Sequence, residues 1–387
     1  MEQIQFNKEE LERYSRHLII PEFNIDGQRK LKGSSVLVIG SGGLGSPLLL
    51  YLAAAGVGRI GIVDFDTVDA SNLQRQVLFG VESVGVAKAV AAKERLASLN
   101  PHITLEVHNT KFTSANAREL VRAYDVVADG TDNFPTRYLV NDACVLENKV
   151  NVYASIYRFE GQASVFNELL PDGTRGPNYR DLFPSPPPPG LVPSCAEGGV
   201  IGVLPGILGS LQALEVIKVI VGLGDTLSGR LFLFDATGFS TRTMKIRKDP
   251  KNPLNGSNPT QSELIDYDQF CGIGLPASQE REVNALSVET LKAWQESGKE
   301  HVLIDVREPY EYGIAQIGGE LIPLASVTES TSRIPRDRPV VVHCRSGVRS
   351  AKAIRQLEDE HGYDNLLNLT GGILEWQAQI DPSLARY

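Results

Sequence analysis

The run Val36-Leu37-Val38-Ile39, followed at once by Gly40-Ser41-Gly42-Gly43-Leu44-Gly45, decides the fold of this 387-residue sequence. Four consecutive apolar, mostly β-branched residues predict a short buried strand, and the apolar stretch 46–55 predicts a helix. A glycine loop between strand and helix presents backbone N–H groups and the positive helix end to a phosphate. The stretch therefore predicts a nucleotide site built on Gly40, Gly42, Gly43 and Gly45.

Strand and helix patterns continue to alternate along the first part of the sequence. Short apolar runs at 59–63, 103–107 and 124–128 predict further strands, and the alanine-rich stretch 87–98 predicts a helix. This alternation is typical of a mostly parallel sheet covered by helices on both faces, so the predicted class is α/β and Rossmann-like. Ligands of such sheets bind beyond the carboxyl ends of the strands. The residues that follow these ends include Gly40, Asp64 and Asp132.

The glycine pattern alone does not separate ATP from a dinucleotide. Asp64 follows the loop by about twenty residues, where a carboxylate suits the ribose hydroxyls of either ligand. A triphosphate also needs cations and a metal ion, whereas hydride transfer needs neither. Groups suited to a polyphosphate follow in Asn72, Arg75, Gln76 and Lys88, and Asp132 offers a carboxylate for Mg²⁺. The alternative for Arg75 and Lys88 is two solvated surface cations, which the neighbouring polar groups make the poorer explanation.

A second chemical loop, Cys344-Arg345-Ser346-Gly347-Val348-Arg349, follows the apolar run 340–343 and precedes a predicted helix from 350 to 360. Loop amides, the helix N-terminus and the arginines Arg345 and Arg349 would stabilise a Cys344 thiolate. A buried structural cysteine does not explain the flanking arginines. A phosphatase loop has five residues between cysteine and arginine, but here there are four, which suits a persulfide better than a phosphate.

Composition shifts divide the chain into two predicted α/β domains. Residues 1–248 form the larger one, and 249–282, rich in Pro, Asn, Gly and Ser, form the linker. Residues 283–387 form a smaller domain with strands at 301–305 and 340–343.

Charge, hydropathy and cysteine pattern limit the partners and the location that the sequence allows. The net charge of −9 disfavours nucleic acid as a partner. The longest apolar stretch, 198–221, contains Pro205, Gln212, Glu215 and Lys218, so we expect a buried helix and no membrane span. The four cysteines form no C-x-x-C pair and the first residues hold no apolar signal core, so a cytoplasmic location is expected.

Five stretches together resemble the ThiF/MoeB family of ubiquitin-activating-like enzymes. They are Arg13–His17, the glycine loop, Val63–Asp66, Ser71–Gln76 and Gly130–Asn133. The resemblance, over residues 10–248, implies ATP-dependent adenylation of the C-terminal glycine of a small ubiquitin-fold carrier protein. It also implies roles for individual residues: Asp64 holds the ribose, Asn72, Arg75 and Lys88 hold phosphates, and Asp132 ligates Mg²⁺. Arg16 would be supplied to the site of the other subunit of a homodimer.

The second domain resembles a rhodanese domain. The stretches that carry this resemblance are Ile304–Glu308, Tyr310–Tyr312, Ile322–Leu324, the Cys344 loop and Gly371–Ile373. It implies that Cys344 carries a persulfide taken from a donor such as a cysteine desulfurase or thiosulfate. Asp305 and Arg307 are expected to orient the fold and the loop rather than to react.

The whole chain thus resembles the MoeZ-type fused adenylyltransferase/sulfurtransferases. This implies that the Cys344 persulfide attacks the activated carrier, which ends in Gly-Gly, and leaves a thiocarboxylate for molybdopterin or related sulfur-containing biosynthesis. In the family, a cysteine at the position of Cys195 has been proposed to bind the carrier covalently, and burial before the apolar helix is an equal alternative. An activating enzyme for ubiquitin-like protein conjugation, with the rhodanese domain only for docking, is the alternative function.

The sequence departs from the family at one place. Many members bind a structural zinc through two C-x-x-C pairs, but the corresponding stretches here read Asn178-Tyr179-Arg180-Asp181 and Asn252-Pro253-Leu254-Asn255. Without thiolates a tetrahedral cysteine zinc site cannot form. The sequence therefore predicts no zinc.

Overall fold

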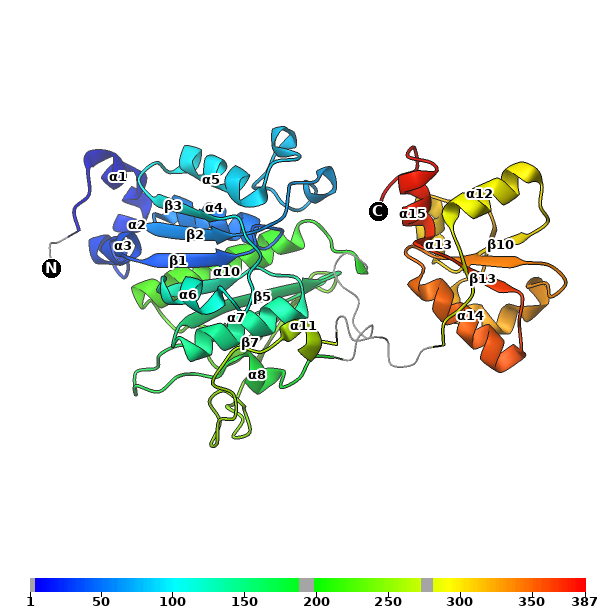
Figure 1. The fold of residues 1–387 in the computed structure, drawn as a ribbon. Coiled ribbons are helices and arrows are strands. Elements are labelled where there is room, and N and C mark those ends of the chain that lie inside the picture. The colour runs from blue at the N-terminus through cyan, green and yellow to red at the C-terminus, as the bar shows by residue number, and fades with distance from the viewer. Residues whose placement is uncertain (1–3, 188–197, 273–280) are drawn as a thin grey trace. The chain divides into compact units, whose positions relative to one another are not determined.

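The computed structural model describes residues 4–187, 198–272 and 281–387 (Figure 1). Its contacts divide the chain into two compact units, Met1–Leu275 and Pro276–Tyr387. Cys195 lies outside the described residues. The two units are described separately below.

The first unit contains one large sheet with helices on both faces. Its strands are β1 (Ser35–Ile39), β2 (Arg59–Val63), β3 (Thr104–His108), β4 (Val126–Asp129), β5 (Val150–Tyr157), β6 (Glu160–Phe166), β7 (Arg230–Asp235) and β8 (Ser240–Lys245). Its helices are α1 (Lys8–Arg13), α2 (Ser15–Leu18), α3 (Asn24–Gly33), α4 (Gly45–Ala55), α5 (Lys88–Leu99), α6 (Ala117–Arg122), α7 (Phe134–Leu146), α8 (Tyr179–Leu182), α10 (Leu204–Val221) and α11 (Tyr267–Phe270).

The sheet order is β3-β2-β1-β4-β5-β6-β7-β8. The strands from β3 to β5 pair in parallel, and β6, β7 and β8 extend the sheet in antiparallel fashion. This confirms the predicted α/β class with a Rossmann-like, mostly parallel sheet. The antiparallel extension was not predicted, because β8 is exposed along its whole length and carries no burial pattern.

Both faces of the parallel strands are buried, which explains their unbroken apolar runs. Along β1, Val36 and Val38 pack with α4, α5 and α10, whereas Leu37 and Ile39 face the opposite core with α6 and α7. Successive side chains of a strand point to opposite faces, so one short run supplies both cores. This sandwich fixes the carboxyl ends of β1, β2 and β4 side by side.

Helix α10 is the longest apolar helix, and by length and composition alone it could cross a membrane. Half of it is buried within the first unit, where it packs on α4, β5 and β6. Its buried Gln212 Nε2 donates to the carbonyl oxygens of Asp129 and Val152 at 2.7 and 2.8 Å. These bonds satisfy both N–H groups of a buried side-chain amide, as expected for the buried helix that the sequence predicts.

Residues 249–272, the first part of the expected linker, fold onto the first unit. Asn252, Leu254 and Cys271 are buried there, and Tyr267 Oη donates to Asp142 Oδ2 at 2.7 Å. Helix α11 packs on α7. Through these contacts the segment adds polar and aromatic side chains to the first unit, although its composition is typical of a loop.

The second unit is a smaller parallel sheet with the order β11-β10-β12-β13-β9. Its strands are β9 (Ala285–Leu286), β10 (Val302–Asp305), β11 (Glu320–Leu321), β12 (Val340–His343) and β13 (Leu366–Leu369). Its helices are α12 (Val288–Ser297), α13 (Pro309–Ile314), α14 (Val348–His361) and α15 (Gly372–Gln379). Val340 and Val342 face the core under α14, and Val341 faces the core under α12 and α15. This is the second, smaller α/β domain that the sequence predicts.

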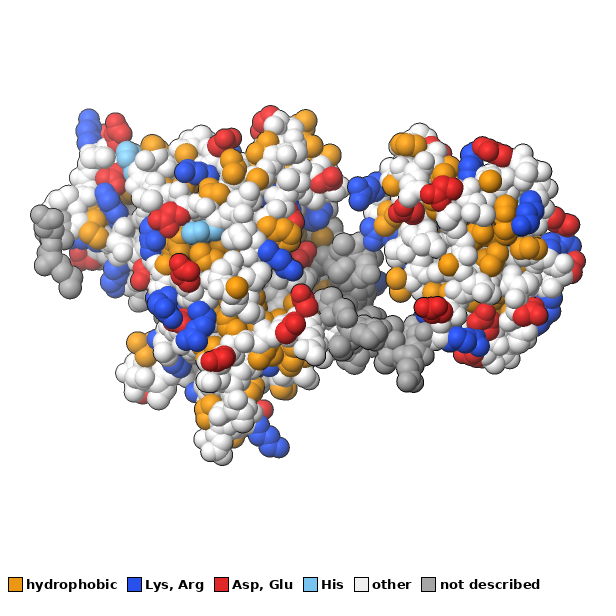
Figure 2. Space-filling model, viewed as in Figure 1, with side chains coloured by type: hydrophobic (Ala, Val, Ile, Leu, Met, Phe, Trp, Pro, Cys, Tyr) orange, Lys and Arg blue, Asp and Glu red, His pale blue; other side chains and the backbone are white. Residues whose placement is uncertain are grey.

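Charged side chains of both signs are interspersed on the face that Figure 2 shows. No broad patch of a single sign stands out on the described part of that face.

Candidate active site

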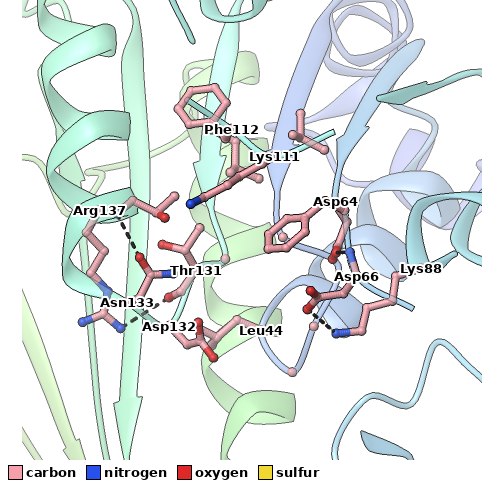
Figure 3. A pocket seen from close by; sticks show the side chains of 18 of the residues that line it. Leu44, Asp64, Asp66, Lys88, Lys111, Phe112, Thr131, Asp132, Asn133 and Arg137 are labelled. Atoms are coloured by element: carbon pink, nitrogen blue, oxygen red, sulfur yellow. Dashed lines mark hydrogen bonds and ion pairs between the residues drawn. The ribbon is translucent and has the colours of Figure 1, made fainter. Parts of the chain in front are cut away.

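A cavity of about 390 Å³ opens at the carboxyl ends of β1, β2 and β4. The loops after these three strands contribute Gly40, Gly42 and Gly43, then Asp64 and Asp66, then Thr131 and Asp132. Figure 3 shows Asp64, Asp66 and Lys88 on one side of it and Thr131, Asp132 and Arg137 on the other. Topology thus brings together groups that are up to about ninety residues apart, as the strand-end rule requires.

The glycines of the first loop allow close backbone approach. A Cβ on Gly45 would lie 2.0 Å from the carbonyl oxygen of Gly40, and Gly40 itself has φ +88°. Gly130, in the loop after β4, also lies close, since its Cβ would be 3.0 Å from the same oxygen. The loop therefore turns tightly into α4 and leaves the first helical N–H groups facing the cavity, where an anion binds well.

Asp64 supports this loop from the end of β2. Its Oδ2 accepts hydrogen bonds from Ser41 N and Ser41 Oγ at 2.8 and 2.7 Å, and its Oδ1 accepts from Asp66 N at 3.0 Å. Its side chain lines the cavity although it is nearly buried. A carboxylate has about four acceptor sites, so these bonds leave capacity for a ligand hydroxyl.

The predicted cations differ in their surroundings. Lys88, only 6% exposed, forms a 3.0 Å ion pair with Asp66 and lines the cavity. Arg75, half-buried, donates from Nη1 to the carbonyl oxygen of Ser71 at 3.1 Å and lines it too. A buried lysine is rare unless its charge is paired, so Lys88 is not a solvated surface cation. Gln76 is also buried at the cavity wall.

Asp132 lies at the cavity because the next residue, Asn133, is the N-cap of α7. Asn133 Oδ1 accepts from Thr136 N at 3.0 Å and caps α7, which leaves Asp132 exposed on the cavity side. Within the described residues, its side chain makes no hydrogen bond or ion pair. No cluster of three or more His, Cys, Asp or Glu side chains is found there either. Magnesium usually takes one or two carboxylates together with phosphate and water oxygens, so this carboxylate fits a nucleotide-bound ion but not a closed protein cage.

Sequence reasoning missed several cavity residues. Asp66, Lys111 and Phe112 follow strand ends, so the rule that found Asp64 could have found them. Arg137, 7% exposed, donates from Nη2 to the carbonyl oxygen of Thr131 at 3.3 Å. Asp268 comes from α11, and no sequence signal placed that segment at the cavity.

Other predicted residues lie elsewhere. Asn72 accepts from Asp69 N at 3.3 Å and closes a short 3₁₀ turn beside the cavity lining. Arg16 is exposed on α2 and does not line the cavity of its own chain.

The sulfur loop lies at the end of β12 in the second unit. Cys344 is fully buried, and its Sγ accepts hydrogen bonds from Gly347 N at 3.1 Å and Ser350 Oγ at 3.4 Å. Gly347, at φ +94°, turns the chain into α14. The loop thus brings a backbone N–H and a hydroxyl group against the sulfur.

The 371–373 motif holds this loop in place. Ile373 N and Leu374 N donate to the carbonyl oxygens of Cys344 and Arg345 at 2.9 and 3.1 Å. A Cβ on Gly372 would lie 2.4 Å from the Cys344 oxygen, so the close approach requires glycine.

Acceptors hold the arginines around Cys344. Arg349 Nη1 and Nη2 donate to the two carboxylate oxygens of Glu311, each at 2.6 Å, and these bonds raise the pKa of the guanidinium. Arg307 and Asp305 form a fully buried ion pair. Arg345 donates from Nε and Nη2 to the main-chain oxygen of Tyr387 at 2.8 and 2.5 Å. Asp305 and Arg307 are thus built into the core beneath the loop, which agrees with the structural role expected of them.

Both units match known families. A model described as the ThiF family matches residues 14–255, and one described as a rhodanese-like domain matches residues 287–379. The chain belongs to the ThiF family. We refer below to residues 1–275 as the ThiF unit and to residues 276–387 as the rhodanese unit.

Relatives match all or most of this chain. The "Probable adenylyltransferase/sulfurtransferase MoeZ" of Mycobacterium tuberculosis is 51% identical over 98% of this chain and 96% of its own length. The "Adenylyltransferase and sulfurtransferase MOCS3" of Aedes aegypti is 42% identical over 99% of this chain and 90% of its own. The "Sulfur carrier protein adenylyltransferase" of Thermus thermophilus is 53% identical and covers 70% of this chain and 100% of its own. These matches confirm the predicted fused adenylyltransferase/sulfurtransferase.

Solved structures support the fold of the ThiF unit. E. coli MccB superposes with a TM-score of 0.57 at 21% identity, covering 67% of this chain and 76% of that one. At this identity the similarity supports a shared fold and nothing more.

Four residues at the place where the sequence predicts no zinc form a hydrogen-bonded cluster in the ThiF unit. Asn178 Nδ2 donates to Asn255 Oδ1 at 3.0 Å, and Asn252 Nδ2 donates to Asn178 Oδ1 at 3.2 Å and to Asp181 Oδ1 at 2.8 Å. Asn178 and Asn252 are buried. We call Asn178, Asp181, Asn252 and Asn255 the amide cluster, which joins two segments about seventy residues apart.

Proposed function

We propose that this chain adenylates the C-terminal glycine of a small ubiquitin-fold sulfur carrier ending in Gly-Gly and then delivers sulfur to it. The observation that carries the proposal is the presence, in one chain, of a strand-end nucleotide cavity lined by a buried lysine and a donor-wrapped Cys344 loop. The names of the MoeZ, MOCS3 and Thermus relatives support both halves of the reaction.

In the first half, a carboxylate oxygen of the carrier attacks the α-phosphorus of ATP and pyrophosphate leaves. Both reactants are anions, so the chain must align them and screen their charge. The glycine loop and the N-terminus of α4 suit the phosphates, Arg75 and Lys88 supply positive charge, and Asp64 suits the ribose hydroxyls. No protein nucleophile is needed for this step.

Magnesium is part of the proposal through Asp132. The ion, when bound, neutralises phosphate charge and lowers the barrier to the departure of pyrophosphate. Asp132 is suited to hold it because its carboxylate lines the cavity without a protein partner among the described residues.

In the second half, the outer sulfur of a Cys344 persulfide attacks the acyl carbon and AMP leaves. The product is an acyl disulfide between the carrier and Cys344. Two electrons from a thiol reductant cleave the S–S bond, which leaves a carrier thiocarboxylate and the Cys344 thiol. Arg345 and Arg349 lie beside the loop and suit the negative charge that moves through this step.

The finer assignments belong to the same proposal. The persulfide donor is a cysteine desulfurase or thiosulfate, the protein acts as a homodimer in the cytoplasm, and Arg16 completes the neighbouring subunit's cavity. The exposure of Arg16 on α2 is compatible with that role. Cys195 is retained as a candidate for a covalent carrier link.

The test is the intact mass of a candidate carrier after incubation with the protein, Mg-ATP and thiosulfate. The proposal expects a mass gain equal to one oxygen-to-sulfur exchange. Cys344→Ala abolishes this gain but keeps carrier-dependent exchange of pyrophosphate into ATP, whereas Asp132→Ala abolishes the exchange. Cys271→Ala and Asp225→Ala, which change residues outside both sites, serve as controls. A Cys344→Ala protein that still forms the product assigns the rhodanese unit to docking and defeats the proposal.

A further inference from the structure

One residue of the rhodanese unit joins two of the arginines around Cys344. Tyr387 accepts two hydrogen bonds from Arg345 at its main-chain oxygen, and its hydroxyl accepts a hydrogen bond from Arg307 Nη1. Its ring centre lies 5.6 Å from Arg345 Cζ and 5.8 Å from Arg307 Cζ, within the range of cation–π attraction. Tyr387 therefore connects the sulfur loop to the buried ion pair of Asp305 and Arg307.

The two loop arginines are anchored in different ways. Arg349 is fixed by the carboxylate of Glu311, which is nearly buried on α13. Arg345 is held by contacts that include the main-chain oxygen and the ring of Tyr387. An arginine side chain has many rotamers, so its charge is useful in a reaction only if something restricts it.

We propose that Tyr387 is a positioning residue of the sulfur site, which holds Arg345 beside the Cys344 loop for an anionic sulfane-sulfur donor. The proposal rests on the proposed function of Cys344. The Cys344 thiolate attacks the outer sulfur of thiosulfate, the S–S bond of thiosulfate breaks, and sulfite leaves with its electron pair. A thiolate and a dianion repel one another as they meet, so a cation already in place favours donor binding.

The test uses the full-length protein in steady-state sulfur transfer from thiosulfate to cyanide, which needs neither ATP nor a carrier. Tyr387→Ala keeps the main-chain oxygen and removes the ring, so we expect it to raise the KM for thiosulfate by about two- to fivefold with kcat changed less than about twofold, the pattern of a lost binding contribution. Tyr387→Phe keeps the ring and the main-chain oxygen, so its KM stays close to that of the unchanged protein. Tyr310→Ala, at a tyrosine of the same unit that is 67% exposed, is the matched control.

A double-mutant cycle separates positioning from a general structural role. If Tyr387 acts through Arg345, then Tyr387→Ala adds no further rise in KM to an Arg345→Ala protein.

Three outcomes overturn the proposal: an unchanged KM in Tyr387→Ala, additive effects in the cycle, or faster turnover, which would mean that Tyr387 blocks the site. Because this assay omits the carrier, its failure is distinct from a failure of the carrier mass test.

Discussion

The amide cluster offers the sharpest test of how the ThiF unit holds together without thiolates. Asn252 Nδ2 donates to Asn178 and Asp181, and Asn252 Oδ1 accepts from Leu254 N at 3.0 Å. Asn252→Ala removes all three bonds at a site that is 2% exposed. At about 0.5–1.5 kcal/mol for each net hydrogen bond, and with the buried Leu254 N–H left unsatisfied, we expect a loss of about 2–3 kcal/mol of unfolding free energy.

Calorimetry can assign this loss to one unit. Both tryptophans, Trp294 and Trp376, lie in the rhodanese unit, so tryptophan fluorescence identifies that unit's transition and leaves the other to the ThiF unit. For a unit of this size, a loss of 2 kcal/mol lowers Tm by about 4–8 °C. The expected drop is confined to the ThiF unit.

The matched control is Asn258→Ala, which truncates an exposed amide of the same segment. Surface changes of this kind stay within about 0.5 kcal/mol. The reasoning is refuted if Asn252→Ala lowers Tm no more than Asn258→Ala does, or if the fluorescence-assigned transition shifts instead.

Three further predictions concern the loops and the metal. Gly45→Ala places a Cβ 2.0 Å from the Gly40 oxygen and should lower pyrophosphate exchange roughly a hundredfold, whereas Gly206→Ala, with open space around it, should not. Burial lowers the pKa of His343 to about 4, so below about pH 6.5 the unfolded chain binds a proton that the folded chain does not bind. The free energy of unfolding of the rhodanese unit therefore falls by about 3 kcal/mol between pH 6.5 and 4. In His343→Gln, urea unfolding followed by tryptophan fluorescence should show a smaller fall. Equal slopes of unfolding free energy against pH in the two proteins would contradict this prediction. Chelation should leave the Tm of the ThiF unit unchanged, and stoichiometric zinc in purified protein would defeat the assignment of the amide cluster as metal-free.

The sequence was sufficient for features that depend on local order. A buried strand, a glycine loop and a helix N-terminus follow one another within about twenty residues at Gly40 and again at Cys344. Parallel pairing then places the ends of β1, β2 and β4 at one edge, which is why Asp64 and Asp132 line the same cavity as the glycine loop. These features need only the strand period and the topology rule.

What the sequence did not predict depends on contacts between distant segments. Asp268 lines the nucleotide cavity because α11 packs on α7, yet its segment has the composition of a linker. Asn178 and Asn252 are polar residues in Pro- and Asn-rich surroundings, and only the folded chain shows that they are buried partners. Tyr387 likewise has no periodic pattern that would connect it to Arg345. A contact of this kind has no local signature, because the loop that closes it can have almost any sequence.

The burial of Cys344 limits how sulfur can pass from the rhodanese unit to a carrier that the ThiF unit has activated. Its side chain has no exposed surface, and its sulfur already accepts hydrogen bonds from Gly347 and Ser350. A bulky acyl adenylate cannot approach that atom directly without opening the loop. A persulfide would carry a second sulfur about 2 Å from the first, and that outer sulfur is the atom that the carrier tail would have to meet. A buried cysteine in this loop is therefore better suited to relay sulfur as a persulfide than to attack the activated carrier with its own thiol, which agrees with the order of steps in the proposed function.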